Sequence, residues 1–431
     1  MTLLHRPHSY AIDFGTSNSL LVAAFEDGEI SEPVPLDPSA PDPSILRSIL
    51  YFPDDPRAPT LFGQEALDTY AAAGMQGRLL RSLKRFLPDP GLHSTLIGQR
   101  KVRLDELIAA LLRTLRLRAN AHFGADVERV LLGRPARYAS NPEHDALALD
   151  RMRSAATLAG FREIDFFPEP VAAARDFDGD LDSRQLVLVA DFGGGTSDFT
   201  LVRMDRTGFT ERDVLATTGV SVAGDALDGA LMRRELARHF GSEVQYQLPM
   251  GSNVLTMPAA LTDMLCTPAK LPLLQSRDVQ GFLKEVRSFA KSPHDRELAE
   301  RFLTVAEDAQ GFGVFEAVEH TKRALSNRPD AEFSFEYADI EIHQQVARSA
   351  FERAIQTPID TIDACVDETL AGAGIAASEV DLVCLTGGTS RVPRVERVLT
   401  ERFGAQRLRR LKGLHSVVTG LGLQAARRIR A

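Results

Sequence analysis

Short apolar runs and longer amphipathic segments alternate along the first part of the chain. Four runs rich in Val, Ile, Leu and aromatic residues predict buried strands, at residues 10–12, 49–52, 127–132 and 163–167. Residues 104–123 carry apolar side chains at helical spacing, and residues 142–159 follow Asn141, a residue type that caps helices. Because strands alternate with helices, the pattern favours an α/β architecture.

The second part of the chain repeats this order and then departs from it. Apolar runs at residues 185–190 and 199–204 predict paired strands, and residues 209–217 predict a third strand. Further helices are expected at residues 225–240, 346–370, 394–403 and 417–429, with a buried strand at 380–385. Between residues 241 and 319 the pattern is mixed and mostly helical, which indicates an inserted subdomain.

A glycine-rich turn connects the apolar runs 185–190 and 199–204. Its sequence, Asp-Phe-Gly-Gly-Gly-Thr-Ser-Asp, runs from Asp191 to Asp198 and predicts a β-hairpin. Three successive glycines leave backbone N–H groups uncovered, which suits close approach by a phosphate. The carboxylate of Asp191 can face a hydrated metal ion beside that phosphate. Taken alone, the turn is equally compatible with a tight glycine hairpin whose aspartates are solvated.

A second Asp-Phe-Gly turn stands near the N-terminus, from Asp13 to Ser19. Each turn follows one apolar run and precedes another, and each places Thr-Ser after its glycine. Such a repeat indicates two similar lobes. Two hairpins facing each other across a cleft could hold a polyphosphate, with Asp13 and Asp191 near the metal.

The composition narrows the class of protein. The chain has 431 residues, 44% of them hydrophobic, which allows two to four domains with substantial cores. Its formal net charge of -9 disfavours nucleic acid as a partner. The 3 cysteines lie far apart without metal-ligand spacing, so a reducing, cytoplasmic location is expected. The sequence shows neither a signal peptide nor a long apolar run, so no membrane association is expected.

Three further motifs stand in order with the two turns. They are Phe-Pro-Glu-Pro at 167–170, Glu-His-Thr-Lys-Arg-Ala-Leu-Ser at 319–326 and Thr-Gly-Gly-Thr-Ser-Arg-Val-Pro at 386–393. Together the motifs resemble the ATPase domain of the 70-kDa heat shock proteins, the DnaK-like family. That family lies within the actin, sugar-kinase and heat-shock ATPase superfamily. The nearest resemblance is to its shortened bacterial members, the YegD-like proteins.

The resemblance implies an α/β chain with the actin-like ATPase fold. Such a fold has two ribonuclease-H-like lobes around a nucleotide cleft, each with an inserted subdomain. Lobe I would comprise residues 1–183, with its insertion at about 45–103. Lobe II would comprise residues 184–431, with a helical insertion at about 241–325.

The resemblance also implies a site for ATP or ADP with Mg²⁺. Catalytic roles would fall on Lys84, Glu169, Asp191 and Asp198, and the metal would be held through water by Asp13 and Asp191. The phosphate loops would contribute Asp13, Gly15, Thr16, Ser17, Gly193, Gly194, Gly195 and Thr196. The remaining nucleotide contacts would come from Gly224, Glu319, Lys322, Arg323, Ser326, Gly387, Gly388, Thr389 and Arg391.

Several of these residues also have plain structural interpretations. Glu169, between two prolines, could stabilise the start of a helix by its charge. Glu319, Lys322 and Arg323 stand at helical spacing and could form a solvated, ion-paired face. The glycines at 387–388 could form an ordinary turn between a strand and a helix.

Lys84 has the weakest basis of the catalytic candidates. It lies in a basic run with Arg78, Arg81 and Arg85, any of which could be a solvated charge. The resemblance implies that Lys84 falls where the family carries its catalytic lysine, and a lysine suits the chemistry because it acts as a point charge on phosphate.

The expected function is a slow ATPase related to the heat shock chaperones, with a co-chaperone or client protein as candidate partner. The chain ends at Ala431 without a β-sandwich peptide-binding domain, so a complete chaperone cycle within this chain is not expected. Three alternatives stay open. They are a nucleotide-gated binding module with little or no turnover, a small-molecule kinase, and an actin-like filament protein.

Overall fold

The computed structural model describes residues 6–73, 76–139, 141–175, 183–205, 211–249, 251, 253–308, 310–410 and 415–430. The chain forms two compact units. Unit 1 consists of Met1–Ala223, Thr361–Arg391 and Val395–Ala431, and unit 2 consists of Gly224–Asp360 and Val392–Arg394. The lobe boundary predicted between residues 183 and 184 lies within unit 1 and stays a prediction.

The first sheet of unit 1 has five strands in the order β10-β9-β1-β2-β3. Their bounds are β1 Ser9–Phe14, β2 Asn18–Ala24, β3 Leu46–Arg47, β9 Arg129–Arg134 and β10 Glu163–Pro168. The hairpin β1–β2 and the pair β2–β3 are antiparallel, whereas β1, β9 and β10 run parallel. The parallel strands carry buried apolar residues such as Ile12 and Leu132, as the apolar runs predicted.

The second sheet of unit 1 repeats this arrangement in the order β13-β12-β11-β18-β19. Its strands are β11 Gln185–Phe192, β12 Ser197–Met204, β13 Val214–Val220, β18 Leu382–Thr386 and β19 Leu408–Arg410. Strands β11 and β12 form an antiparallel hairpin. On one side β13 pairs antiparallel with β12, and on the other β18 and β19 run parallel to β11. The third strand was expected at 209–217; part of that range lies outside the described residues, and the strand begins at Val214.

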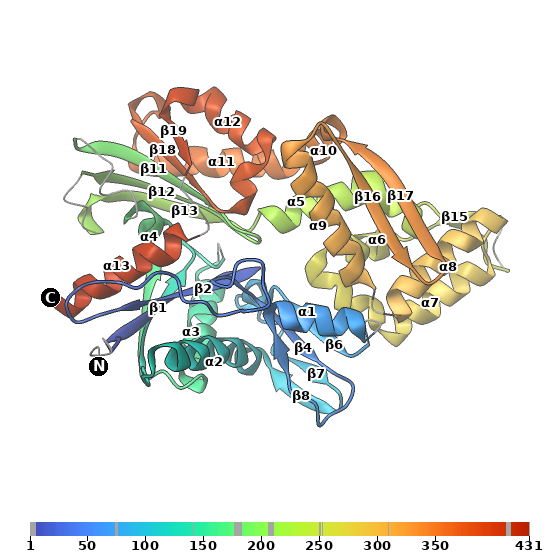
Figure 1. Cartoon of the computed structure of the whole chain (residues 1–431). Helices are drawn as coiled ribbons and strands as arrows, with labels where there is room; N and C mark the ends of the chain where they lie inside the picture. Colours follow the sequence, from blue (N-terminus) through green and yellow to red (C-terminus); the bar gives the residue numbers. More distant parts are fainter. Residues whose placement is uncertain are drawn as a thin grey trace. The chain divides into compact units, whose positions relative to one another are not determined.

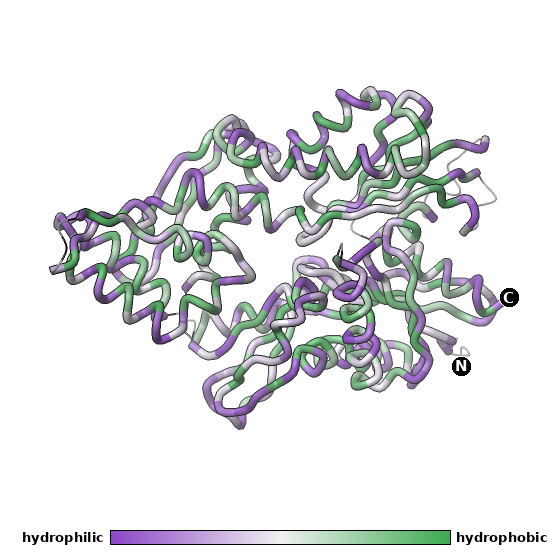
Figure 2. Tube along the Cα trace, turned by 180° about the vertical axis from the view of Figure 1, so that it is seen from behind, coloured by the Kyte–Doolittle hydropathy of each residue, from purple (hydrophilic) through white to green (hydrophobic). Residues whose placement is uncertain are grey.

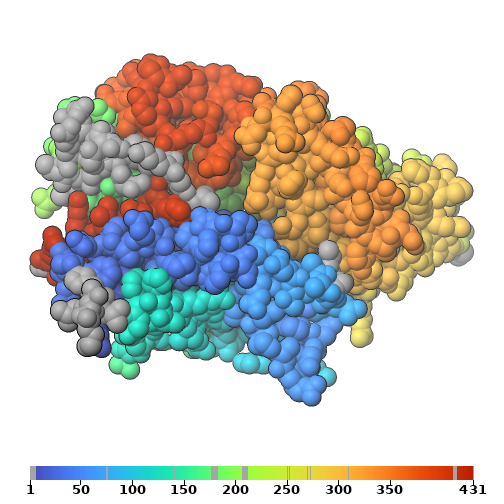
Figure 3. Space-filling model, viewed as in Figure 1, coloured from blue at the N-terminus to red at the C-terminus, as the bar shows by residue number. Residues whose placement is uncertain are grey.

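Two helices join the two sheets into one core. The helices α4 (Glu169–Arg175) and α13 (Ser416–Arg430) share a hydrophobic cluster with strands of both sheets, including Val22 and Val189. A Cβ at Gly420 would lie 1.8 Å from the carbonyl oxygen of Ala172, so only glycine allows α13 to approach α4 this closely. Figure 1 and Figure 3 show the C-terminal helix, in red, lying against the blue N-terminal strands.

The other face of the first sheet is covered by α2 (Leu104–Phe123) and α3 (Pro142–Leu158). The α2 bounds equal those predicted from its apolar spacing. Asn141 caps α3, because its side chain accepts hydrogen bonds from the backbone N–H groups of Glu143 and His144.

Between β3 and α2 lies an insertion with small sheets of its own. Strands β4 (Ile49–Phe52), β5 (Leu61–Phe62) and β6 (Arg78–Arg81) form one sheet in the order β5-β4-β6, and β7 (Ser94–Ile97) pairs with β8 (Arg100–Arg103). The helix α1 spans Gly63–Ala72, and a short 3₁₀ turn, η1, spans Leu83–Phe86.

Unit 2 begins with α5 (Gly224–Leu231), which continues irregularly as a π turn, Met232–Leu236, and a 3₁₀ turn, Ala237–Phe240. Four more helices follow: α6 Ala259–Leu265, α7 Arg277–Ser288, α8 Pro293–Glu307 and α9 Gly311–Asn327. Smaller elements are β14 Gln245–Tyr246, β15 Leu255–Thr256 and the 3₁₀ segment Pro268–Gln275. Figure 2 shows green and purple alternating along these helices, as expected for helices with one buried face.

The hairpin of β16 (Asp330–Tyr337) and β17 (Ile340–Ala347) packs on α9. The apolar residues of β16 alternate with polar ones: Phe333 and Phe335 are buried while Ser334 is exposed, as in a strand with one buried face.

The single long helix predicted at 346–370 is wrong. The segment forms two helices, α10 (Arg348–Ala354) and α11 (Gln356–Ala373), which meet at Ile355. Pro358 explains the break, because its ring would clash with the carbonyl of Ala354 in a continuous helix, whereas proline is tolerated in the first turn of a new one.

The remaining helices, α12 (Pro393–Phe403) and α13, end the chain near their predicted positions. None of the described helices combines the length and apolar character that crossing a bilayer requires.

Candidate functional site

The two Asp-Phe-Gly turns have the same backbone geometry. In the first, the N–H of Gly15 donates to the carbonyl oxygen of Asn18 at 2.9 Å. In the second, the N–H of Gly193 donates to the carbonyl oxygen of Thr196, also at 2.9 Å. A Cβ at Gly15 would lie only 2.4 Å from the Asn18 oxygen, so the tight closure of this turn requires glycine.

The two turns lie next to each other in unit 1. A Cβ added to Gly195 would be 3.2 Å from Oγ1 of Thr16, so the backbone of the second turn approaches the side chain of the first. Two segments far apart in the sequence therefore meet in one place. A polyphosphate bound at one turn would be within reach of the other.

A third glycine loop supports the second turn. Gly387 has a positive φ of 80°, and a Cβ there would be 2.1 Å from the carbonyl oxygen of Phe192. The hydroxyl of Thr389 donates to the carbonyl oxygen of Gly193 at 2.9 Å. A short 3₁₀ turn, η8, begins at Gly388 and ends at Arg391. The loop after β18 thus packs directly on the glycine-rich turn.

Lys84 forms a buried ion pair with Glu169. The distance from Nζ to Oε1 is 2.6 Å, and each side chain is only 9% exposed. Glu169 is the first residue of α4, as its alternative interpretation required, but its carboxylate is directed to Lys84. Lys84 lies in η1, and it is buried while its neighbours Arg81 and Arg85 are partly exposed. Burial thus distinguishes Lys84 within the basic run.

Three aspartates lie close enough to this pair for their charges to interact. Asp13 lies near the end of β1, while Asp191 and Asp198 face each other across the hairpin β11–β12. Asp198 is held in place, since its Oδ1 accepts a hydrogen bond of 2.9 Å from the N–H of Ala136.

The electrostatics of the cluster favour uptake of positive charge. Burial, followed by the charge of Glu169, raises the pKa of Asp13 to about 7, and Lys84 opposes this increase. Burial and Glu169 likewise raise the pKa of Asp198 to about 7, against hydrogen bonds from Thr196 and Ala136. The pKa of Asp191 is raised well above its usual value by burial, then by Glu169, Asp198 and Asp13.

The pKa of Lys84 is raised as well, which for a lysine favours the charged form. Burial lowers its pKa, but the neighbouring Glu169, Tyr138 and Asp13 outweigh burial, so the pKa of Lys84 is raised and the lysine stays charged. The cluster therefore combines four carboxyl groups with this one ammonium group.

A magnesium ion suits this set of donors. Carboxylate oxygens are the ligands Mg²⁺ prefers, and the ion keeps several waters of its own. No group of three or more His, Cys, Asp or Glu side chains in the described part of the chain is arranged to hold a metal directly. The carboxyl groups of Asp13 and Asp191 are oxygen donors of the kind that a hydrated magnesium ion accepts.

The other predicted nucleotide contacts lie on α5 and α9 of unit 2. Lys322 is not solvated: its Nζ is 2.7 Å from Oδ2 of Asp228 and 3.3 Å from the carbonyl oxygen of Gly224. Burial raises the pKa of Asp228 to about 6, although Lys322 opposes this increase. Lys322 is thus fixed by a buried partner one turn into α5.

Elsewhere on α9, Glu319 and Arg323 form an ion pair at the spacing of one helical turn, with Arg323 65% exposed. The ion pair agrees with the alternative interpretation of this helix face, but only Arg323 is solvated, since the Glu319 side chain is 18% exposed. Ser326 donates to the carbonyl oxygen of Lys322 at 3.2 Å.

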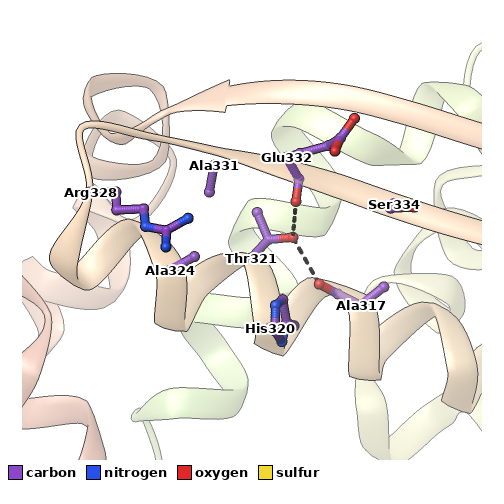
Figure 4. A pocket seen from close by; sticks show the side chains of 8 residues that line it. All are labelled: Ala317, His320, Thr321, Ala324, Arg328, Ala331, Glu332 and Ser334. Atoms are coloured by element: carbon purple, nitrogen blue, oxygen red, sulfur yellow. Dashed lines mark hydrogen bonds between the residues drawn. The ribbon is translucent and has the colours of Figure 1, made fainter.

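A pocket of about 330 Å³ lies between α9 and β16, as Figure 4 shows. Its floor is closed by Thr321, whose hydroxyl donates to the carbonyl oxygens of Ala317 and Glu332. The other lining residues are His320, Ala324, Arg328, Ala331 and Ser334. None of the nucleotide contacts predicted on α9 lines this pocket.

Sequence reasoning missed several groups that shape the two Asp-Phe-Gly turns. Ser48 donates to the carbonyl oxygen of Gly15 at 2.8 Å and pairs with the hydroxyl of Ser19 at 2.9 Å. The N–H of Ser48 also donates to the carbonyl oxygen of Ser17 at 2.8 Å. A serine of this kind carries no sequence signal, because a residue between β3 and β4 reaches the first turn only through the fold.

The loop after β9 was also missed, although a signal for it existed. It carries Ala136, the donor to Asp198, and the buried Tyr138. In α/β sheets, ligands meet the loops at the carboxyl ends of parallel strands, and this loop follows such a strand. The end of the predicted strand 127–132 could therefore have been searched for site residues.

Two sheets of one strand order, each with an Asp-Phe-Gly turn at the end of its first strand, define a chain of the actin-like ATPase fold. The family follows from comparison with known sequences. The family described as Hsp70 protein matches residues 86–257 and 307–427, which is more than half of the chain. The chain belongs to the Hsp70 family, as the sequence motifs predicted; the nearer likeness to YegD-like members stays a prediction. The match excludes Lys84 and the first turn.

Curated relatives cover most of the chain at low identity. It is 25% identical over 444 residues to a "Chaperone protein DnaK" of Thermus thermophilus, covering 96% of this chain and 60% of that protein. It is 27% identical over 436 residues to the "Chaperone protein HscA homolog" of Verminephrobacter eiseniae, covering 96% and 57%. The HscA homolog of Photobacterium profundum is 31% identical over 280 residues, covering 60% and 43%. The chain thus spans about 60% or less of the length of these relatives.

Proposed function

We propose that this chain binds ATP with Mg²⁺ and hydrolyses it slowly to ADP and phosphate. One observation carries the proposal: a buried Lys84–Glu169 pair accompanied by three aspartates, beside two adjoining glycine turns. Positive charge and hydrogen-bond donors in one place are what phosphoryl transfer needs, because its transition state is stabilised mainly by positioning and electrostatics.

The phosphate contacts would come from the turns. The N–H groups that follow Gly15 and those at 194–196 would donate to phosphate oxygens, and the hydroxyls of Thr16 and Ser17 would add further donors. Asp13 and Asp191 hold the hydrated Mg²⁺. When bound, the ion offsets negative charge on the phosphates and orients them.

Glu169, Lys84 and Asp198 would act on the attacking water and the γ-phosphate. The water oxygen forms a bond to the γ-phosphorus, and the bond from that phosphorus to the bridging oxygen breaks, leaving its electron pair on ADP. The water gives up a proton to a carboxylate and then to solvent. Asp198, with a pKa of about 7, suits a base that works near neutral pH. Lys84 places a fixed positive charge for the γ-phosphate oxygens.

The remaining roles follow from family membership. Gly224, Glu319, Lys322, Arg323 and Ser326 are proposed to hold adenine and ribose. Gly387, Gly388, Thr389 and Arg391 are proposed to lie along the adenosine and α-phosphate. The fixed position of Lys322 on Asp228 supports a preorganised contact.

The biological setting is proposed from the printed names of relatives, which are chaperone proteins. We infer a chaperone-like role in the cytoplasm with a co-chaperone or client protein as partner. A pull-down with a model unfolded peptide measures whether this chain binds a client by itself.

Calorimetric titration with ATP and ADP, with and without Mg²⁺, followed by a phosphate-release assay, tests the proposal. Saturating MgATP should raise the melting temperature, because a ligand that binds only the folded state stabilises it by mass action. Absence of both heat and thermal shift would refute nucleotide binding. Binding without phosphate release above background would favour a nucleotide-gated binding module instead.

A further inference from the structure

The loop between β9 and α3 brings a tyrosine close to the buried ion pair. Tyr138 is only 5% exposed, and its N–H donates to Oδ1 of Asp145 at 2.6 Å, which anchors the loop. Two residues earlier, the N–H of Ala136 donates to Asp198. The same loop therefore holds one aspartate of the site and carries a buried aromatic side chain.

The hydroxyl of Tyr138 is buried and has no hydrogen-bond partner among the described residues. A buried tyrosine hydroxyl normally finds a partner, because burying an unsatisfied polar group is unfavourable. Other buried tyrosines of unit 1 follow that rule: the hydroxyl of Tyr10 donates to Asn120 and that of Tyr51 to the carbonyl oxygen of Gln76. Tyr138 is the exception that needs an explanation.

The surroundings of this hydroxyl are the proposed catalytic groups. Burial raises the pKa of Tyr138, the charge of Lys84 opposes the increase, and the charge of Glu169 adds to it. The charges of both members of the ion pair therefore act on this hydroxyl, and no hydrogen bond joins it to either one. Water both donates and accepts hydrogen bonds, so a water molecule that accepts from this hydroxyl can also donate to the carboxylate of Glu169.

We propose that the Tyr138 hydroxyl donates a hydrogen bond to the water that attacks the γ-phosphate. This inference rests on the proposed ATPase function and assigns a further residue to it. The hydroxyl occupies one lone pair of the water, Glu169 accepts one of the water's hydrogens, and the second lone pair is left for the phosphorus. The bond changes are those of the hydrolysis itself, and Tyr138 exchanges no proton with the substrate.

Such a contact would orient the attacking water. A water held by two fixed partners spends more time in the geometry of attack, which accelerates the chemical step without strengthening nucleotide binding. A purely structural tyrosine makes the opposite prediction. Removing an unsatisfied hydroxyl would then stabilise the protein and leave the rate unchanged.

Tyr138→Phe separates these accounts, because it removes the hydroxyl and keeps the ring. Single-turnover hydrolysis of preloaded MgATP should slow by at least about five-fold, while the Kd for MgATP stays within about two-fold of the parent. Tyr51→Phe is the matched control: it removes a buried hydroxyl from the insertion, so it should lower the melting temperature and leave the hydrolysis rate unchanged.

The outcomes are distinguishable. If the parent hydrolyses ATP and Tyr138→Phe does so at the parent rate, the inference is overturned and the proposed function survives. If Tyr138→Phe loses nucleotide affinity and melting temperature together with rate, the residue acts structurally and the inference is again overturned. If the parent releases no phosphate above background, the proposed function fails and this inference fails with it.

Discussion

The two Asp-Phe-Gly turns share a backbone but differ in their chemistry. Both end the first strand of a five-stranded sheet, and both are closed by a glycine N–H donating at 2.9 Å across the turn. Across the first hairpin, however, Asp13 faces the apolar Leu20. Across the second, Asp191 faces Asp198, so the second turn carries two carboxylates side by side.

The supports of the two turns differ as well. The first is held by the hydroxyl of Ser48, which donates to Gly15. The second is held by the loop after β18, through Thr389 and the close approach of Gly387. The same strand–turn–strand unit can therefore present different groups, because the side chains opposite the aspartate and around the turn come from other parts of the fold.

The largest effect is expected from Gly195→Val, because the added side chain would push the two turns apart. A Cβ there already lies 3.2 Å from Oγ1 of Thr16, and the branched methyls of valine would need further room. We expect at least about a hundred-fold loss of MgATP affinity, roughly 2.7 kcal/mol, with the fold retained. Calorimetry and far-UV circular dichroism measure the two quantities.

The matched control is Gly281→Val on α7, where a Cβ would meet nothing within 4 Å. This variant should bind MgATP like the parent. Normal binding by folded Gly195→Val would contradict the idea that the adjoining turns form one phosphate site.

The next largest effect is expected from Lys84→Met, which removes the cation shared by the carboxylates of both turns. Hydrolysis should slow by at least about ten-fold, or roughly 1.4 kcal/mol of transition-state stabilisation, while MgATP affinity changes only a few-fold. Single-turnover assays and calorimetry give the two numbers.

Arg81→Ala and Arg85→Ala are controls in the same basic run, and both should hydrolyse ATP at the parent rate. If either one were slow and Lys84→Met were not, the assignment of the lysine would be wrong.

The stability of the protein should depend on pH through Asp198 of the second turn. Burial and Glu169 raise the pKa of Asp198 from its usual 3.8 to about 7, against Thr196, Ala136 and Lys84, so the folded protein binds this proton more tightly than the unfolded chain. The associated stability is full below about pH 4 and is lost as the pH rises through about 7. Nucleotide-free parent protein should therefore lose stability between about pH 4 and pH 7.

Asp198→Asn carries no titrating group at this position, so its free energy of unfolding should fall less over the same range. Urea unfolding at several pH values provides the comparison. Equal slopes for parent and variant would show that Asp198 is not the group that titrates.

The smallest effects are expected from the supports of the turns. Ser48→Ala deprives both the Gly15 carbonyl and the Ser19 hydroxyl of a partner, whereas Thr389→Val deprives only the Gly193 carbonyl. At about 1 kcal/mol for each lost hydrogen bond, Ser48→Ala should be the more destabilising. Thermal unfolding measures the order, and MgATP affinity should fall by no more than about five-fold in either variant.

Ser288→Ala, which removes an exposed hydroxyl bonded within α7, is a control for the loss of a serine side chain. It should change neither quantity. A larger effect from Thr389→Val than from Ser48→Ala would reverse the proposed order of the two supports.

The features that the sequence determined by itself are local ones. The helix at 104–123 follows from apolar spacing within a single segment, and Asn141 caps α3 through its immediate neighbours. The two turns follow from glycines that close them over a span of a few residues. The family also follows from such short motifs. In each case the physical cause lies inside the segment that shows the pattern.

The tertiary structure decided what the motifs left open. Lys84 and Glu169 are 85 residues apart, and only folding buries them together while Arg81 and Arg85 stay partly exposed. The break at Ile355 is an intermediate case, since Pro358 was visible in the sequence but its effect depends on where the helix begins. Charge, burial and hydrogen bonding at the site arise between segments that are distant in the sequence. The spacing of residues along the chain therefore does not predict them.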